Sequence, residues 1–113
     1  MTDCLFCSFV SGAITPDIVC ETPTTLAFRD INPQAPTHVL IVPKAHYATA
    51  AELAVAEPTV MADVISTAAA VAADEGLDNG YRLVLNTGAD AGQSVFHVHC
   101  HLLGGRYLEW PPG

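Results

Sequence analysis

The sequence predicts an α+β fold in which an antiparallel sheet of about five strands is covered on one face by one long helix. Three observations lead to this prediction. Residues 96–102 alternate between apolar side chains and histidines, which is the period of a half-buried strand. Residues 38–42 are almost continuously apolar, as in a strand that is buried on both faces. Residues 58–75 carry apolar side chains at helical spacing.

Length and composition bound the possibilities further. A chain of 113 residues is expected to form a single domain over 1–113, and its 50% hydrophobic content argues against disorder. No apolar run reaches the roughly 18 residues that span a membrane, and the N-terminus lacks the basic start of a signal peptide, so we expect a cytoplasmic protein. A net charge of −8 argues against binding of nucleic-acid polymers, because that binding depends on the neutralisation of many phosphates by cationic side chains.

The N-terminal third predicts a short helix and two short antiparallel strands. The helix covers residues 4–10, with Asp3 as its N-cap and Gly12 as its stop signal. The strands cover residues 18–21 and 26–29, with a turn at Pro23 between them. Residues 30–36 form a proline-containing loop that can hold Asp30 at low entropic cost.

The remaining elements follow from the same signals. Strand 38–42 ends at Pro43, and the long helix carries Pro58 in its first turn and Gly76 just past its end. The turn signal Asn79-Gly80 precedes a strand at 81–86, which we expect to form a hairpin with strand 96–102. The apolar face of the long helix comprises Val60, Met61, Val64, Ile65, Ala68, Val71 and Ala72.

The strand at 96–102 is the main candidate for chemistry, because alternation places His97, His99 and His101 on one face. Near neutral pH an imidazole can act as nucleophile, acid, base or metal ligand. The alternative is a solvated strand face that is rich in histidine.

Cys4 and Cys7 have the Cys-x-x-Cys spacing of zinc ligands, and a tetrahedral site needs two further ligands. His46 and His97 are the candidates. The alternative is a pair of thiols on the surface of a helix without a metal. Cys20 and Cys100 are interpreted as small buried hydrophobic residues.

The segment His97-Val98-His99-Cys100-His101-Leu102-Leu103 resembles the motif of the histidine-triad (HIT) family. Further segments are similar to the Hint branch of this family, whereas the nucleotidyltransferase branch, with Gln at the third triad position, fits worse because His101 stands there. These segments are Gly92-Gln93-Ser94-Val95, Gly104-Gly105-Arg106, residues 28–38, Val42-Pro43-Lys44-Ala45-His46 and Trp110-Pro111-Pro112-Gly113. The resemblance implies the HIT fold and a homodimer whose sheets continue across a two-fold axis.

The resemblance also implies a reaction: hydrolysis of purine nucleoside 5′-monophosphoramidates or acyl-nucleotides, derivatives of AMP or GMP, without a catalytic cofactor. His99 would form a covalent nucleotidyl intermediate, and His101 would donate to a phosphate oxygen. Ser94 and the backbone N–H groups of Gln93 and Ser94, after Gly92, would complete the phosphate cradle and bind the leaving amine.

Other positions have expected roles in nucleotide binding. Asp30, with Ile31 beside it, is expected at the ribose hydroxyls, and Asn86 at the sugar or phosphate. His38 orients the triad in the family, but a satisfied histidine at a strand start is an equal possibility. Trp110 is expected either in the partner's site or packed on its own subunit. The base is expected to contact apolar residues from the group Leu5, Phe6, Phe9, Ile18 and Phe28. Each of these residues could equally well belong to the hydrophobic core.

The resemblance to bacterial relatives implies a structural zinc held by Cys4, Cys7, His46 and His97, tying the N-terminal helix to the sheet. Three alternatives remain for the function. The triad itself could chelate zinc in a metal hydrolase, or the protein could be a non-catalytic regulator that binds purine nucleotides. Within the family, a dinucleoside polyphosphate hydrolase is the nearest rival, against which the tail Trp110-Pro111-Pro112-Gly113 weighs.

Overall fold

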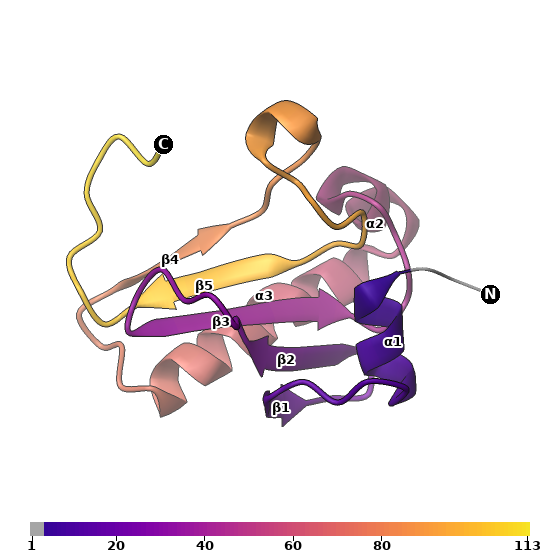
Figure 1. Ribbon diagram of the computed structural model, residues 1–113, viewed down its shortest axis with the longest axis horizontal. Helices are drawn as coiled ribbons and strands as arrows, with labels where there is room; N and C mark the ends of the chain where they lie inside the picture. The colour runs from indigo at the N-terminus through magenta and orange to yellow at the C-terminus, as the bar shows by residue number, and fades with distance from the viewer. Residues whose placement is uncertain (1–3) are drawn as a thin grey trace.

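The computed structural model describes residues 4–113 and has the predicted α+β architecture (Figure 1). A five-stranded antiparallel sheet has α3 behind it and α1 in front of it in this view. The elements are α1 (Leu5–Ser11), β1 (Ile18–Glu21), β2 (Thr25–Arg29), β3 (Thr37–Pro43), α2 (Ala50–Ala56), α3 (Pro58–Asp74), β4 (Tyr81–Val84), the 3-10 turn η1 (Ala89–Ala91) and β5 (Cys100–Gly104).

The strand order in the sheet is β1-β2-β3-β5-β4, and every neighbouring pair is antiparallel. The central strand β3 is buried along its whole length, which explains its nearly continuous apolar sequence. The predicted pairing of residues 81–86 with the triad strand is confirmed, with Val84 opposite His101. The edges of the sheet are β1 and β4.

The long helix α3 lies against the sheet as predicted and buries Val64, Ala68, Val71 and Ala72. The expectation for Ile65 is wrong, because its side chain is 40% exposed. Thr67 is buried instead, and its hydroxyl lies 2.9 Å from that of Thr25 on β2, so the polar atom is satisfied. None of the helices within residues 4–113 combines the length and apolarity needed to cross a membrane.

The N-terminal helix is present and ends at Gly12 as predicted, in the left-handed conformation. Its N-cap is Cys4, whose Sγ accepts a hydrogen bond from the Cys7 N–H at 3.4 Å. Asp3, the predicted cap, lies outside the described residues. Phe6 is the buried residue of this helix and packs with Phe28 on the face of the sheet opposite α3.

A second short helix, α2, was not predicted. Thr49 caps it, since its hydroxyl accepts the N–H of Glu52, and Leu53 is fully buried between α2 and the core. The sequence Thr49-Ala50-Ala51-Glu52 has capping-box spacing, so a signal for this helix was available.

The triad strand is shorter than predicted, because β5 begins at Cys100 and not at residue 96. Continuation of the ladder would place the preceding residues beside Pro43, which has no N–H to donate. The Val98 N–H instead donates to the Tyr47 carbonyl at 2.8 Å. Strand β4 likewise ends at Val84, two residues before the predicted boundary. His97 and His99 therefore lie on the segment just before the strand, with His97 at a bend.

Candidate active site and metal centre

His99 has a defined tautomer. Its Nδ1 lies 2.8 Å from the backbone carbonyl oxygen of His97. Because a carbonyl oxygen only accepts hydrogen bonds, Nδ1 carries the proton and donates. In the neutral ring this leaves an unprotonated lone pair on Nε2. A histidine held in this way is suited to nucleophilic attack.

His101 has the opposite tautomer, set by a chain of hydrogen bonds. The backbone N–H of Gln34 donates to Nδ1 of His38 at 3.0 Å, so neutral His38 carries its proton on Nε2. That Nε2–H donates to Nδ1 of His101 at 2.9 Å. His101 therefore carries its proton on Nε2. The triad thus combines a lone pair on His99 with an N–H donor on His101.

The ionisation of this pair fits the tautomers. Burial, together with repulsion from His99 and His38, lowers the pKa of His101 to about 4, against the attraction of Asp30. Burial also lowers the pKa of His38, whose Nε2 lies 3.4 Å from Oδ2 of Asp30. Both rings are therefore neutral at pH 7, as a relay of single N–H donors requires.

A half-buried strand would leave its histidine face exposed to solvent, but the structure covers this face. His97 is 0% and His99 is 8% exposed, and His101 is half-buried. Phe6 on α1 contacts the His99 ring, with centroids 5.1 Å apart and planes at 74°. The alternation itself is retained, because the residues between the histidines are in the main core: Val98, Cys100 and Leu102. A solvated histidine strand is thereby excluded.

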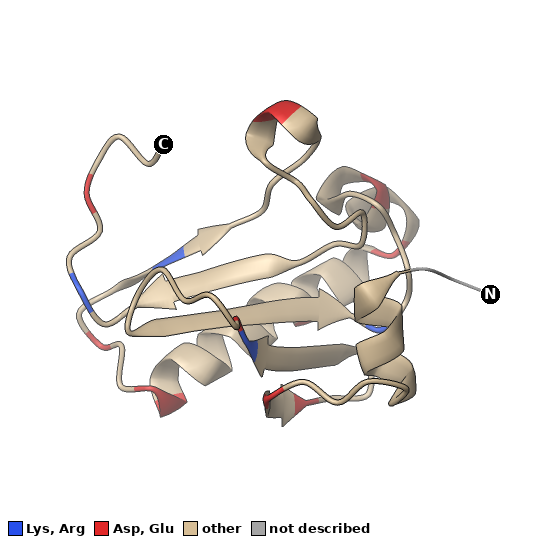
Figure 2. Ribbon diagram, in the orientation of Figure 1, with Lys and Arg blue, Asp and Glu red and all other residues tan. Residues whose placement is uncertain are grey.

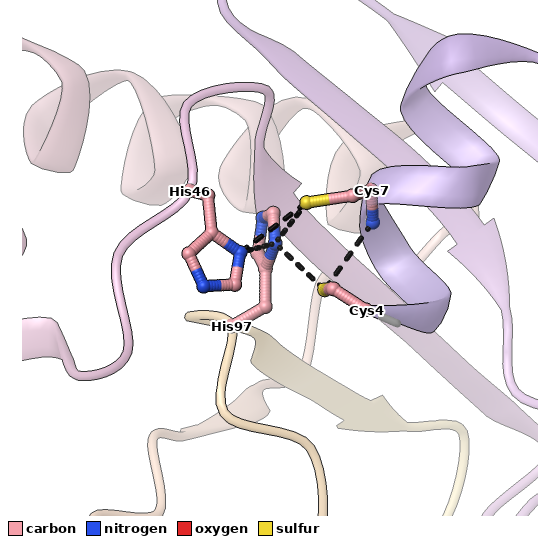
Figure 3. Close-up of side chains that lie close together, drawn as sticks. All are labelled: Cys4, Cys7, His46 and His97. Atoms are coloured by element: carbon pink, nitrogen blue, oxygen red, sulfur yellow. Dashed lines mark hydrogen bonds between the residues drawn. The ribbon is translucent and has the colours of Figure 1, made fainter. Parts of the chain in front are cut away.

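The predicted metal ligands come together as one cluster (Figure 3). Cys4 and Cys7 project from the start of α1, His46 from the loop after β3, and His97 from the segment before β5. Nδ1 of His97 lies 3.3 Å from Sγ of Cys4 and 3.1 Å from Nδ1 of His46, and Sγ of Cys7 lies 3.2 Å from Nδ1 of His46. Tetrahedral zinc implies separations of about 3.6 Å for sulfur to nitrogen and 3.3 Å for nitrogen to nitrogen. The four donors fit a zinc ion.

The orientation of His97 fits the same role. Its Nε2–H donates to the Pro43 carbonyl at 2.8 Å, which leaves the lone pair of Nδ1 directed at the cysteines. Burial lowers the pKa of His97 and so favours the neutral ring. No group of ligand atoms within residues 4–113 contains all three triad histidines, so the structure gives no support to the metal hydrolase in which the triad chelates zinc.

The other two cysteines belong to the core. Cys100 is fully buried, and burial raises the pKa of its thiol to about 11, which keeps it protonated. Cys20 is half-buried against the same core and is thus less buried than predicted.

The predicted nucleotide contacts lie on β2, in the loop after β2 and after β4, and Asp30 is the one of them that is close to His101. Asp30 is in the loop beside His38, and its Oδ1 accepts the N–H of Asn32 at 2.8 Å. Ile31 is fully exposed next to it. Asn86 is half-buried and lies two residues beyond Val84, the partner of His101. Phe28 is 3% exposed and is covered by Phe6 and Phe9.

The phosphate cradle expected at residues 92–94 differs in part from the prediction. The Gln93 N–H donates to the Gly88 carbonyl at 3.1 Å and is therefore already used within the loop. The buried Gln93 side chain donates to the Ala48 carbonyl at 2.7 Å and so fixes this loop to the segment before α2. Gly92 adopts the left-handed conformation after η1, and the Ser94 side chain is exposed. Ser94 is thus the member of this group that is open to a ligand.

Trp110 belongs to the tail that follows β5, and this tail runs at the end of the molecule away from α1 (Figure 1). It is 78% exposed and packs near the Arg82 guanidinium, 5.9 Å from the ring centroid. The same guanidinium donates to the carbonyls of Leu108 and Glu109. Trp110 therefore does not join the triad of its own chain.

The four Lys and Arg residues are scattered over the molecule and form no cluster (Figure 2). Arg29 pairs with Glu75 at 2.9 Å, and Lys44 pairs with Glu21 at 2.7 Å. Arg82 and Arg106 donate to backbone carbonyls. A phosphate at the triad must be held by imidazole, hydroxyl and backbone donors.

Two groups with a part in this site carried no direct sequence signal. The Gln34 N–H and the Pro43 carbonyl set the tautomers of His38 and His97, but both are backbone atoms, which any residue type supplies. Only the fold brings them to the imidazoles.

Comparison with known proteins agrees with this arrangement. Residues 11–108 match the family described as HIT domain. A 14 kDa zinc-binding protein of Zea mays is 46% identical over 112 residues, which cover 96% of this chain and 87% of that protein. The HIT family hydrolase from Legionella pneumophila has a TM-score of 0.94 and 48% identity, covering 98% of this chain and 100% of that one.

A more distant structure, the histidine triad nucleotide-binding protein from Candida albicans, has a TM-score of 0.82 and 33% identity over 96% of this chain and 83% of that one. The match extends over most of the sequence and over the whole architecture. The chain belongs to the HIT family.

Proposed function

We propose that this protein hydrolyses derivatives of purine nucleoside 5′-monophosphates. It would cleave the phosphorus–nitrogen bond of phosphoramidates or the phosphorus–oxygen bond that joins the phosphate to the acyl group of acyl-nucleotides. The observation that carries the proposal is the pair of opposite tautomers on His99 and His101. One ring offers a lone pair and its neighbour offers an N–H, with ring centroids 5.0 Å apart. This is the combination that nucleophilic attack at a phosphate requires.

In the first step Nε2 of His99 attacks phosphorus, and the bond from phosphorus to the amine nitrogen breaks. The departing nitrogen takes a proton from solvent water, with Ser94 as its hydrogen-bond partner, and leaves as the neutral amine. His101 donates its Nε2–H to a phosphate oxygen, where negative charge increases. In the second step water attacks the nucleotidyl-histidine, which releases the nucleoside monophosphate and restores the neutral imidazole. The attacking water returns one proton to solvent, so the overall reaction consumes one water molecule.

Binding of the nucleoside is assigned to the loop after β2 and to the segment after β4. The Asp30 carboxylate accepts the ribose hydroxyls, with the exposed Ile31 beside it in the loop, and Asn86 contacts the sugar or phosphate. Phe28 packs against the rings of Phe6 and Phe9 and is the apolar residue that we assign to the base. The shortage of free cations at the triad favours a substrate with a single phosphate over a polyphosphate.

We assign zinc to the cluster of Cys4, Cys7, His46 and His97. A complete Cys₂His₂ set is the donor set of structural sites, in which zinc supplies a cross-link and keeps no open position for water. The 14 kDa zinc-binding protein of Zea mays, at 46% identity, favours this metal.

We further propose a homodimer formed along β4. This is an edge strand, and such strands expose N–H and C=O groups to a second chain. Arg82 on β4 holds the tail, so a partner paired there would be approached by Trp110, which is 78% exposed. Analytical ultracentrifugation at micromolar concentration tests this, and a monomer would contradict it.

The test of the reaction is release of AMP from adenosine 5′-phosphoramidate by wild-type protein and by His99→Ala, each with and without excess chelator. We expect a rate that is lower but still measurable in chelator and is absent in the variant. Turnover that strictly requires metal, or that survives the substitution, contradicts the proposal. Tight purine-nucleotide binding without turnover would favour a regulatory protein, and faster cleavage of a dinucleoside polyphosphate would favour that branch.

A further inference from the structure

His97 connects two centres through two different groups. Its ring nitrogen Nδ1 belongs to the cluster of Cys4, Cys7 and His46, which we call the Cys–His centre. Its backbone carbonyl accepts the Nδ1–H of His99. We propose that the Cys–His centre is a positioning device for the nucleophile, so that metal binding there sets the orientation and reactivity of His99. This inference rests on the proposed function of His99.

The first connection passes through the backbone of residues 97–99. This segment precedes β5 and is outside the strand ladder, so the sheet does not fix it. Two hydrogen bonds hold it: the Val98 N–H donates to the Tyr47 carbonyl, and the His97 ring donates to the Pro43 carbonyl. The loop that supplies Tyr47 also supplies His46. A metal that joins the rings of His46 and His97 therefore fixes the carbonyl that orients His99.

The second connection passes through α1. Cys7 and Phe6 are neighbours on this helix of 7 residues, which is too short to be stable alone. The Phe6 ring contacts both His97 and His99, with centroids 6.0 Å and 5.1 Å away and planes at 79° and 74°. Metal binding by Cys4 and Cys7 anchors the helix and so keeps Phe6 against the nucleophile.

The remaining substrate contacts are on other elements. Asp30 lies in the loop after β2, and His101 lies within β5 and is fixed by His38. Loss of the Cys–His centre should therefore leave nucleoside binding nearly intact while His99 adopts other orientations. The expected effect is on kcat, by about 10- to 100-fold, the usual range for residues that orient a reactive group. KM should change by less than about threefold, because its main contacts are retained.

The experiment compares zinc-loaded wild-type protein with Cys7→Ser and with Cys20→Ser. Cys20 is a half-buried thiol outside the Cys–His centre, so its variant controls for the chemical change. Three quantities are measured: bound zinc, kcat and KM for adenosine 5′-phosphoramidate, and the ¹⁵N shifts of the His99 imidazole, which report its tautomer. Folding is checked by amide NMR spectra.

For Cys7→Ser we expect loss of zinc, a mixture of His99 tautomers and the fall in kcat, while Cys20→Ser matches wild type. Chelation of the wild-type protein and re-addition of zinc should produce and reverse the same changes, which covers the case of a variant that does not fold. Unchanged His99 shifts after loss of zinc would overturn the proposal, as would a wild-type protein that binds no zinc. A protein without phosphoramidase activity would refute the proposed function, yet the His99 shifts would still test the coupling.

Discussion

Nε2 of His38 lies 2.9 Å from Nδ1 of His101, and the other nitrogen of His38 accepts the Gln34 backbone N–H. A backbone group thus determines, through two rings, that His101 presents an N–H at the active site. A backbone donor cannot change its protonation state near neutral pH. The direction of the relay is therefore fixed by the fold.

Replacement of His38 should therefore reduce turnover without removing the nucleophile. In His38→Ala the Nδ1 atom of His101 loses its donor, and the ring can adopt the tautomer that lacks the Nε2–H. We expect kcat to fall by about 10- to 100-fold. His38→Gln can donate an amide N–H to His101 and should recover part of the rate. Steady-state kinetics decide the point, and equal rates for the alanine variant and wild type would refute the relay.

Asp30→Asn tests the ribose contact. The asparagine oxygen can still accept the Asn32 N–H, so the loop should keep its turn. Loss of the charge should raise KM for adenosine 5′-phosphoramidate by about tenfold, since hydrogen bonds to charged groups are worth roughly 1.5–3 kcal/mol. A substrate without the 2′ and 3′ hydroxyls serves as control, because wild type and variant should handle it alike. A variant equally impaired on both substrates would place Asp30 elsewhere in the mechanism.

The low pKa of His101 makes the stability of the protein depend on pH. Its pKa is about 4 in the folded protein and about 6.5 in an unfolded chain. Between these values the unfolded chain binds a proton that the folded protein does not. The free energy of unfolding should therefore rise with pH from about 4 to 6.5, and this contribution should be constant outside the window.

Melting temperatures across this window, in excess chelator to remove any effect of metal, provide the measurement. Wild type should show a steeper rise with pH than His101→Gln, which has no titrating group at that position. Parallel curves would mean that His101 titrates normally in the folded state.

Leu53 anchors α2, the helix that was not predicted although its capping-box signal is present in the sequence. Its side chain is 0% exposed, whereas Val55 on the same helix is 86% exposed. Leu53→Ala should lower the free energy of unfolding by about 2–5 kcal/mol, and Val55→Ala by less than about 0.5 kcal/mol. Urea unfolding monitored by circular dichroism distinguishes the two, and similar losses would indicate that α2 is not packed on the core.

Most of the fold was predictable, because its strongest signals are local. The continuous apolar run of β3 and the helical stripe of α3 each reflect one dominant packing surface. The boundary at Cys100 was not predictable, since it depends on Pro43 and Tyr47 far away in the sequence. The alternation of apolar residues and histidines in the sequence continues through residues 97–99 although no neighbouring strand pairs with them.

The sequence indicated which residues form the candidate site better than it indicated how deeply they are buried. The cluster of Cys4, Cys7, His46 and His97 assembles as the motif and the resemblance implied. The burial of His97 and His99 was missed, because alternation places side chains on a face without saying what covers it. Here Phe6 covers it from a helix more than 80 residues earlier in the chain.

We propose that Nε2 of His99 forms a bond to phosphorus during turnover. Trapping of this covalent intermediate is the most direct test. Wild-type protein is mixed with adenosine 5′-phosphoramidate, quenched within milliseconds and digested for mass spectrometry. We predict an adenylyl group on the peptide that carries His99, released by acid and absent from His99→Ala. An adduct on another residue, or rapid turnover with no adduct at any quench time, would contradict the account.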